Sequence, residues 1–348
     1  MDITQILKFA NEQDASDVHI SAGESPILRI DGSIKRLKVT PLNADQTQEM
    51  LYDIMNDSQR KIFEEKNDID FAIEVGDIMR LRVNVYSQKR GMGAVFRKIP
   101  TEVLTMEQLN LPMSLYDIAK KERGLFLVTG PTGSGKSTTL AAIIDKMNSE
   151  REGHILTVED PIEFVHKSKR CLINQREVHT NTKSFAAALK AALREDPDVI
   201  LVGEMRDLET IQLALTAAET GHLVLGTLHT SSAPKTVDRI IDVFPPEQQG
   251  QVRAMFAESL QGIVTQTLCK KVGGGRIAAQ EILIGTTAIK NLIREGKIHQ
   301  IPSMMQTSQG IGMTTLDMAL ADLLEAGKIT RQTAIDKAAN PIDFMEKQ

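Results

Sequence analysis

The octapeptide GPTGSGKS, residues 130–137, places three glycines, a lysine and hydroxyl groups in the spacing G-x-x-x-x-G-K-S. In this spacing the glycines adopt backbone angles that other residues resist, so that successive N–H groups converge on phosphate oxygens. Lys136 is expected to reach the β- and γ-phosphates, Ser137 to ligate Mg²⁺, and Thr138 to lie near the α-phosphate. The segment therefore predicts a site for ATP and Mg²⁺ that comprises Gly130, Pro131, Thr132, Gly133, Ser134, Gly135, Lys136, Ser137 and Thr138.

The flanks of this loop decide between a phosphate site and a glycine-rich turn without a ligand. An apolar run, LFLVT at residues 125–129, precedes the loop, and a helical pattern that starts at Lys136 follows it. A P-loop requires a strand before it and a helix after it, and the helix adds the positive end of its dipole to the site. The context therefore favours nucleotide binding.

A second candidate group lies in the segment DVILVGEMRD, residues 198–207. Four apolar residues predict a buried strand that ends at Gly203 and Glu204. A carboxylate at the end of a strand beside a P-loop is the Walker B arrangement, which holds Mg²⁺ partly through water. Here a glutamate stands in place of the usual aspartate, and a solvated loop acid is the alternative interpretation of Glu204.

The segment TVEDPIEF, residues 157–164, brings three acids, Glu159, Asp160 and Glu163, close to one proline. Carboxylates this close repel one another unless a cation or a hydrogen-bond network offsets the repulsion. Pro161 stiffens the turn and pushes Asp160 toward extended geometry. The segment therefore predicts a Mg²⁺–water site with one acid as general base, and an acidic cap of a short helix is the alternative.

Two histidines flank another apolar run, in the segment ETGHLVLGTLHTSSA. His222 precedes the predicted strand and His229 ends it, so that the two are too far apart to share one small metal site. A lone histidine near a strand end is more often structural than catalytic. His229 follows the strand after the Walker B strand, where RecA-like ATPases are expected to carry a γ-phosphate sensor, whereas Asp17 and His19 are interpreted as structural.

Composition narrows the class of protein. The chain has 348 residues, 41% of them hydrophobic and 25% charged, which is typical of globular material and indicates two or three domains. A formal net charge of -5 disfavours a nucleic-acid partner, and two isolated cysteines exclude a zinc ribbon. Because the start of the chain lacks the layout of a signal peptide and no apolar run approaches the ~20 residues of a membrane span, we expect a soluble, cytoplasmic protein without direct membrane insertion.

The pattern of elements changes once along the chain. Residues 1–98 mix short strands and helices, with a hairpin turn predicted at Asp31 and Gly32, a second at Gly76 and Asp77, and helical spacing over 43–66. This predicts a small α+β domain, followed by a linker over 99–112 that carries prolines and no clean periodicity. From 113 to 348, five short apolar segments (GLFLVTG, HILTVED, DVILVGE, HLVLGTLHT and RIAAQEILIG) alternate with helical patterns, and a string of helices ends the chain. Such alternation predicts an α/β domain with a parallel sheet that is covered on both faces.

Four motifs in this order match a known family. GPTGSGKST, TVEDPIEF, ILVGEMRD and TGHLVLGTLHT resemble the Walker A, Asp box, Walker B and His box of the secretion ATPase superfamily. The segment AIKNLIRE, residues 288–295, resembles the signature of the PilT-type retraction ATPases of type IV pili, with Lys290 in the position where that signature usually has arginine. The periodicity of the same segment, taken alone, predicts an ordinary amphipathic helix whose residues Ile289, Leu292 and Ile293 face the core.

The resemblance implies a RecA-like P-loop ATPase domain behind a smaller, PAS-like N-terminal domain, assembled as a homo-hexamer with ATP between the two domains. It makes Glu163 the general base, lets Glu204 organise Mg²⁺ and its water, and assigns the His box to His222, as a nucleotide-binding residue, and His229, as a catalytic residue. The family also uses arginines of the N-terminal domain. The candidates are Arg80, Arg82, Arg90 and Arg97, of which we favour Arg82 and Arg97, because successive residues of a strand face opposite sides and the four cannot all point inward.

The resemblance further implies a motor that hydrolyses ATP to power pilus retraction and twitching. Its partners would be an inner-membrane platform protein and an accessory retraction ATPase, with the motor at the cytoplasmic face of the inner membrane. An accessory retraction paralogue of the PilU type stays open as an alternative. A pilus-extension or type II secretion ATPase is a further alternative. Such proteins usually carry an extra N-terminal domain and a four-cysteine motif, whereas this sequence has two cysteines, which disfavours this alternative. Outside this class, a nucleotide-gated adaptor and a nucleic-acid translocase are the alternatives.

Overall fold

The computed structural model describes residues 2–30, 33–76, 79–99 and 102–345. The chain divides into two compact units, Met1–Glu102 and Val103–Gln348. The predicted turn at Asp31 and Gly32 lies outside the described residues, as do Asp77 of the second predicted turn and residues 100–101 of the predicted linker. The domain limits at 98 and 112 stay a prediction.

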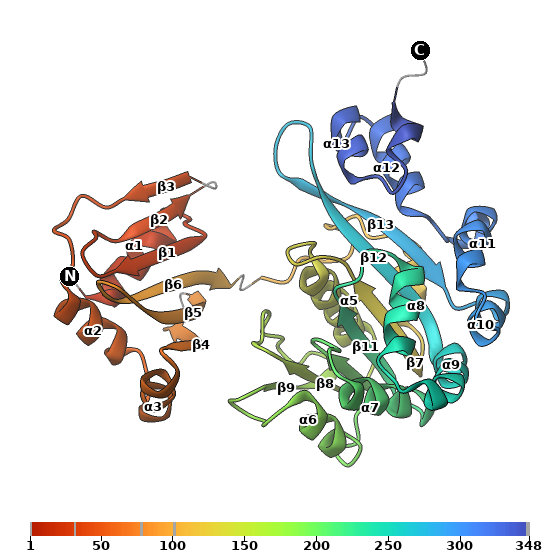
Figure 1. Ribbon diagram of the computed structural model, residues 1–348, viewed down its shortest axis with the longest axis horizontal. Coiled ribbons are helices and arrows are strands. Elements are labelled where there is room, and N and C mark those ends of the chain that lie inside the picture. Colours follow the sequence, from red (N-terminus) through yellow and green to blue (C-terminus); the bar gives the residue numbers. More distant parts are fainter. Residues whose placement is uncertain (1, 31–32, 77–78, 100–101, 346–348) are drawn as a thin grey trace. The chain divides into compact units, whose positions relative to one another are not determined.

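The N-terminal unit is built on an antiparallel sheet (Figure 1). In the described residues this sheet has six strands in the order β3-β2-β1-β6-β5-β4. The strands are β1 Asp17–Ser21, β2 Ile27–Ile30, β3 Ser33–Arg36, β4 Asp68–Val75, β5 Met79–Gln88 and β6 Gly91–Ile99. The helices are α1 Ile3–Glu12, α2 Ala44–Asp53 and α3 Asp57–Lys66.

The helical pattern predicted over 43–66 forms two helices rather than one. Asn56 interrupts it: its side chain accepts a hydrogen bond from the backbone N–H of Gln59, and the Gln59 side chain accepts one from the N–H of Asn56. Asn43 and Gln46 make the same reciprocal capping box at the start of α2. A second cap in the middle of an apolar pattern therefore starts a new helix.

The two faces of the N-terminal sheet differ in chemistry. One face carries Val18, Val83 and Phe96 and packs with Ile6 and Leu7 of α1 in a single buried cluster. The strand register places Arg82 directly opposite Arg97 on the other face, and Arg97 opposite Asp17. Arg82 and Arg97 therefore share the face opposite the buried one. Arg80, two residues before Arg82 on β5, lies on that face as well, so alternation does not separate Arg82 from Arg80 and the choice between them stays a prediction.

The C-terminal unit is built on a mainly parallel sheet. Its described part has seven strands in the order β13-β12-β7-β11-β10-β8-β9, in which β13 alone runs antiparallel to its neighbour. The strands are β7 Gly124–Thr129, β8 Gly153–Glu159, β9 Cys171–Glu177, β10 Val199–Val202, β11 Leu223–Leu228, β12 Leu260–Lys270 and β13 Arg276–Ile284. The strands β9 and β12 are additions to the five that the sequence predicted.

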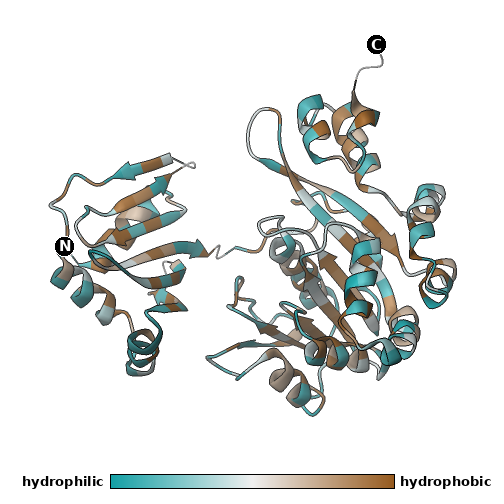
Figure 2. Ribbon diagram, viewed as in Figure 1, coloured by the Kyte–Doolittle hydropathy of each residue, from teal (hydrophilic) through white to brown (hydrophobic). Residues whose placement is uncertain are grey.

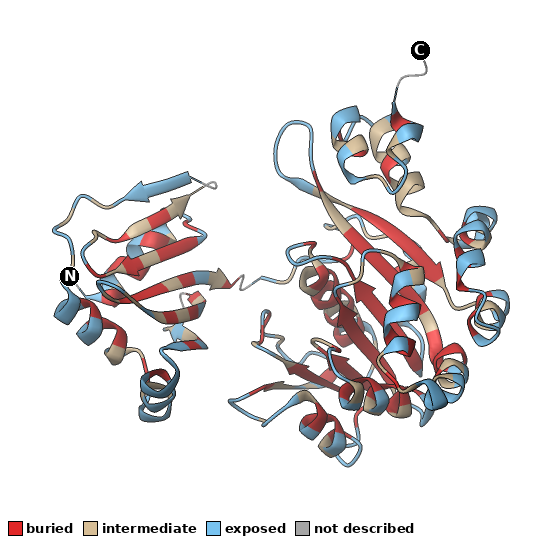
Figure 3. Cartoon of the chain, viewed as in Figure 1, coloured by how far each residue is buried: buried red, intermediate tan, exposed pale blue. Residues whose placement is uncertain are grey.

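Helices cover both faces of this sheet, which makes the central strands continuously apolar and buried (Figures 2 and 3). The helices are α4 Met113–Ala119, α5 Lys136–Glu150, α6 Phe185–Ala192, α7 Leu208–Glu219, α8 Ala233–Asp242, α9 Pro246–Ser259, α10 Thr287–Arg294, α11 Ile301–Thr307, α12 Leu316–Glu325 and α13 Arg331–Lys337. Leu125 and Leu127 of β7 face the cluster that contains α7 and α9, whereas Phe126 and Val128 face α4 and α5. The predicted fold class, an α/β unit preceded by a smaller α+β unit, is confirmed.

Two further predictions concern helices. The segment AIKNLIRE falls on α10, which buries Ile289 and Ile293 and leaves Leu292 half-buried against the same core. Among the described residues, no helix combines the length and the apolar character needed to cross a bilayer.

Candidate nucleotide site

The glycine-rich loop lies between the buried strand β7 and the 15-residue helix α5. Gly133 and Gly135 have positive φ angles of 77° and 90°, a backbone conformation that residues with a Cβ rarely adopt. Gly135 is the N-cap of α5 and provides no capping side chain, and the hydroxyl oxygen of Ser134 is buried without a hydrogen-bond partner. A helix N-terminus with open donors and an unsatisfied buried hydroxyl fits a phosphate group.

Lys136 lies at the base of this loop. Its ammonium group donates hydrogen bonds to the carbonyl oxygens of Gly130, at 2.8 Å, and Pro131, at 3.1 Å, and lies 3.5 Å from Nδ1 of His229. Burial lowers the pKa of Lys136, and the negative charges of Glu204 and Glu163 only partly offset this effect. The negative charges of both predicted catalytic carboxylates thus favour the protonated form of the P-loop lysine.

Glu204 follows the end of β10 and is held by two basic side chains. Its Oε1 lies 2.9 Å from Nε2 of His229, and Arg206 donates a hydrogen bond of 2.6 Å to its Oε2. Burial alone would raise the pKa of Glu204, but Arg206, His229 and Lys136 outweigh burial and lower it. The structure thus brings together three predicted site residues, Lys136, Glu204 and His229, with Glu204 as a carboxylate.

His222 has a different position. It precedes β11, and its carbonyl oxygen accepts a hydrogen bond from the N–H of Gly124, at the start of β7. Its Nδ1 lies 3.0 Å from the carbonyl oxygen of Ala217 at the end of α7. Because β7 and β11 are parallel and the P-loop follows the other end of β7, the six-residue strand separates His222 from that loop by roughly 20 Å. Within this unit, the structure does not bring His222 to the loop with which the sequence grouped it.

The Asp-box segment follows β8 and forms no helix over residues 160–170, so the alternative of an acidic helix cap is wrong. Glu159 is half-buried at the end of β8, and its Oε1 accepts hydrogen bonds from Thr157, at 2.7 Å, and Gln175, at 3.2 Å. Burial raises the pKa of Glu159. The Asp160–Pro161 peptide bond is cis. Glu163 is exposed, in contrast to Glu159, and its carboxylate is open to a ligand.

Polar side chains fix the irregular backbone on both sides of Glu163. Glu177 accepts a hydrogen bond from the N–H of Ile162, at 3.1 Å. The amide of Gln175 donates to the carbonyl oxygen of Phe164 and accepts from the N–H of His166, each at 2.8 Å. These contacts hold a segment without regular structure in one backbone conformation, and no pattern in the sequence predicts them.

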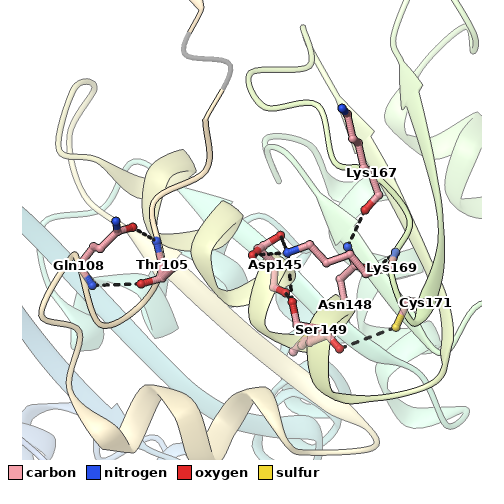
Figure 4. Close-up of polar contacts among 9 residues, drawn as sticks. Thr105, Gln108, Asp145, Asn148, Ser149, Lys167, Lys169 and Cys171 are labelled. Carbon is pink, nitrogen blue, oxygen red and sulfur yellow. Dashed lines mark hydrogen bonds and ion pairs between the residues drawn. The ribbon is translucent and has the colours of Figure 1, made fainter.

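Helix α5 fixes the last part of the same segment (Figure 4). Asn148 is fully buried; its amide donates to the carbonyl oxygen of Lys167, at 2.8 Å, and accepts from the N–H of Lys169, at 2.9 Å. Asp145, one turn earlier, forms an ion pair of 2.7 Å with the Lys169 ammonium group. The helix that begins at the P-loop therefore also anchors the segment that carries Glu163. The sequence signal available was an asparagine at helical spacing from Ile144 in α5, which does not by itself identify the partner of its amide.

Replacing Asn148 with alanine should destabilise the protein more than replacing Lys169 with methionine. Asn148→Ala leaves the carbonyl oxygen of Lys167 and the N–H of Lys169, both partly buried, without this partner, which costs about 1–3 kcal/mol. Lys169→Met removes an ion pair whose side chains are 45% and 21% exposed, and such pairs contribute about 1 kcal/mol or less. Thermal melting of the full chain measures both, and equal losses of melting temperature would contradict this ranking.

The oxygen ligands at the loop fit a magnesium ion. In the described part of the chain, no three His, Cys, Asp or Glu side chains are arranged to hold a metal. The predicted donors are instead the half-buried hydroxyl of Ser137, at the start of α5, and the Glu204 carboxylate. Mg²⁺ usually takes few protein oxygens and keeps several waters and substrate phosphates, so this donor set matches its chemistry.

Comparison with known proteins assigns the family. The family model described as type II/IV secretion system protein matches residues 1–322. The chain belongs to this family. The crystal structure of a pilus retraction motor, PilT with bound ADP, is 49% identical and superposes with a TM-score of 0.93 over 99% of this chain and 98% of that one. The likeness supports the predicted fold class, a RecA-like unit preceded in the chain by a smaller N-terminal unit.

Three curated relatives extend over nearly the whole chain. The type IV pilus retraction ATPase PilT of Pseudomonas aeruginosa is 59% identical over 99% of this chain and 100% of its own length. A twitching motility protein of Neisseria gonorrhoeae is 52% identical over 97% of this chain and 91% of its own. The type IV pilus ATPase PilU of Pseudomonas aeruginosa is 41% identical over 100% and 92%. The predicted resemblance to PilT-type secretion ATPases is confirmed.

Proposed function

We propose that this protein is the ATP-hydrolysing motor that powers type IV pilus retraction. The observation that carries the proposal is 59% identity to a retraction ATPase over 99% of this chain and 100% of that one. The site supports it, because Lys136, Glu204 and His229 meet at a loop whose backbone fits phosphate. In this proposal the chain works as a homo-hexamer at the cytoplasmic face of the inner membrane.

Each residue of the nucleotide site has its own role in ATP binding or hydrolysis in this proposal. The loop N–H groups and Lys136 bind the β- and γ-phosphates, and Ser137 and Glu204 hold Mg²⁺, which when bound neutralises charge on the phosphate oxygens. Glu163 accepts the proton of the attacking water. His229 contacts both Lys136 and Glu204. Because these two residues hold the γ-phosphate and Mg²⁺ in this proposal, His229 responds to the presence of the γ-phosphate.

Two arginines of the N-terminal unit complete the chemistry in this proposal. Arg82 and Arg97 lie opposite each other on adjacent strands, with side chains 44% and 69% exposed. Their guanidinium groups supply positive charge to the phosphates during turnover in the assembled ring. Hydrolysis then depends on the arrangement of the units, which couples phosphate chemistry to mechanical work.

The partners in this proposal are an inner-membrane platform protein that receives the mechanical work and an accessory retraction ATPase. Identity to PilU, at 41%, is lower than identity to PilT, at 59%, which favours the main motor over the accessory role. An adaptor without turnover has no need of the carboxylates around Lys136, and a net charge of -5 disfavours a nucleic-acid translocase.

Deleting the gene in its own host should leave cells with many surface pili and no twitching. A retraction motor removes pili, so its loss lets them accumulate. Electron microscopy counts the pili and a surface-motility assay measures twitching, with the wild-type gene and a Lys136→Ala allele as matched complements. The wild-type gene should restore movement and the Lys136→Ala allele should not. Bald cells would instead assign the protein to extension, and unchanged twitching would contradict a main motor.

A further inference from the structure

The strand behind the P-loop carries a buried glutamine. β12 runs parallel to β7, with Val264 opposite Val128 and Thr265 opposite Thr129, so its next residue, Gln266, lies behind the first residues of the loop. Gln266 is 2% exposed, and both the nitrogen and the oxygen of its side-chain amide have hydrogen-bond partners. Burying an amide is costly unless its donors and acceptor are paired, so these contacts determine how the side chain is oriented.

The amide nitrogen of Gln266 fixes one peptide plane of the loop. It donates a hydrogen bond of 2.7 Å to the carbonyl oxygen of Ser134. In a trans peptide the C=O and the following N–H point in opposite directions. Because the Ser134 carbonyl is turned toward β12, the N–H of Gly135 is turned away from β12, toward the interior of the loop.

The amide oxygen of Gln266 ties the same contact to the helix and to the next strand. It accepts hydrogen bonds from the hydroxyl of Thr139, at 2.9 Å, and from the amide nitrogen of Gln280 on β13, at 3.2 Å. Two donors at this oxygen leave the nitrogen of Gln266 to face Ser134. Thr139 belongs to the first turn of α5, so one side chain joins the loop, the helix and the sheet.

Close approach of β12 also explains two of the loop glycines. A Cβ on Gly135 would lie 2.8 Å from the amide nitrogen of Gln266, and a Cβ on Gly130 would lie 2.3 Å from its backbone oxygen. Real Cβ contacts are not this short. The loop therefore needs glycine at these positions to pack on Gln266 as well as to turn its N–H groups toward a ligand.

We propose that Gln266 is a positioning residue that orients the Gly135 N–H toward the phosphates of a bound nucleotide. The proposal rests on the nucleotide binding assigned to this site above. Gln266 touches no phosphate itself and acts through the peptide bond between Ser134 and Gly135. Without it that peptide is free to rotate, and one of the donors that converge on the phosphate is lost.

The test is the dissociation constant of ADP for the purified full-length protein. Gln266→Met keeps the length of the side chain and removes its hydrogen bonds, and we expect the ADP dissociation constant to rise about tenfold. Inorganic pyrophosphate, used as a competitor, should lose affinity by a similar factor, because the lost donor faces phosphate rather than the nucleoside. A general structural defect would not be expected to lower the affinities for ADP and for pyrophosphate by the same factor.

Thr139→Val is the matched control. It removes one donor to the Gln266 oxygen but leaves the bond to Ser134, so ADP affinity should stay within about threefold of wild type. Gln266→Glu is the second variant, for the case that Gln266→Met does not fold. It keeps an acceptor for Thr139 and Gln280 and sets an oxygen against the Ser134 carbonyl, so it should weaken ADP at least as much.

The outcomes separate the two proposals. Wild-type ADP affinity in a folded Gln266→Met or Gln266→Glu variant would overturn the role of Gln266 and leave the proposed function intact. Weaker ADP binding with unchanged pyrophosphate affinity would also overturn it, since the effect would then lie outside the phosphate loop. A wild-type protein that binds no ADP would overturn the proposed function, and this inference with it.

Discussion

Glu163→Gln should reduce the rate of ATP hydrolysis by about 10²–10⁴-fold, the range that a positioned general base contributes. Glutamine has the same shape but does not accept the proton of the attacking water. ADP affinity should not change, because the phosphate loop is built separately on β7, β12 and α5. Phosphate release measures the rate, and equilibrium binding of ADP measures the affinity.

The structure predicts that this variant folds. The backbone around Glu163 is fixed by the side chains of Glu177, Gln175 and Asn148, all of which stay in place. Glu152→Gln is the control: it changes an exposed glutamate whose carboxylate pairs with Arg170, and turnover should stay within about twofold of wild type. If Glu163→Gln hydrolysed ATP at the wild-type rate, another group would have to serve as the base.

The parts of the site that were predicted from the sequence depend on local spacing or on a simple rule of topology. The loop conformation follows from glycines at fixed intervals between a strand and a helix, as the φ angles of Gly133 and Gly135 show. Parallel strands end at one edge of a sheet, so Lys136, Glu204 and His229 meet although they are far apart in the chain. The same rule explains why His222, at the start of its strand, is separated from them.

The parts that were not predicted depend on packing between distant segments. β12 has the sequence LQGIVTQTLCK, and polar residues inside it break the apolar pattern by which the other strands were recognised: Gln261, Thr265, Gln266 and Thr267. The strand forms because it pairs with β7 on one side and β13 on the other. Since the strand was missed, the glutamine behind the loop was missed with it.

Asn148, on helix α5, is a second residue whose role depends on packing between distant segments and was not predicted. Sequence alone does not tell whether a polar residue in an amphipathic pattern faces water or an irregular loop. Here the loop over 160–170 has no strand or helix to satisfy its backbone groups, and buried side chains take that role. The partner of Asn148 lies 19 residues later in the chain, beyond the reach of any helical or strand period.

Arg97→Ala should lower the rate of ATP hydrolysis by about 10³-fold or more, the range known for arginines that stabilise phosphoryl transfer. The structure shows what holds this side chain. Its Nε donates a hydrogen bond of 2.8 Å to the carboxylate of Asp17. Burial alone would raise the pKa of Asp17, but the hydrogen bonds from Arg97 and Ser16 outweigh burial and lower it. Asp17 thus anchors one edge of a guanidinium group that is otherwise 69% exposed.

Arg82 should behave like Arg97, since the register sets the two opposite each other, while Arg90 is the control. Arg90 pairs with Glu24 and has a similar exposed side chain, so Arg90→Ala should keep turnover within about twofold of wild type. Light scattering must accompany the phosphate assay, because a ring that falls apart would also lose activity.

Arg97→Lys separates the effect of charge from that of geometry. A lysine keeps the positive charge but lacks the forked donors of arginine, so this variant should recover only a small part of the rate. Full activity of an assembled Arg97→Ala protein would remove this arginine from the chemistry and leave its contact with Asp17 as a purely structural one.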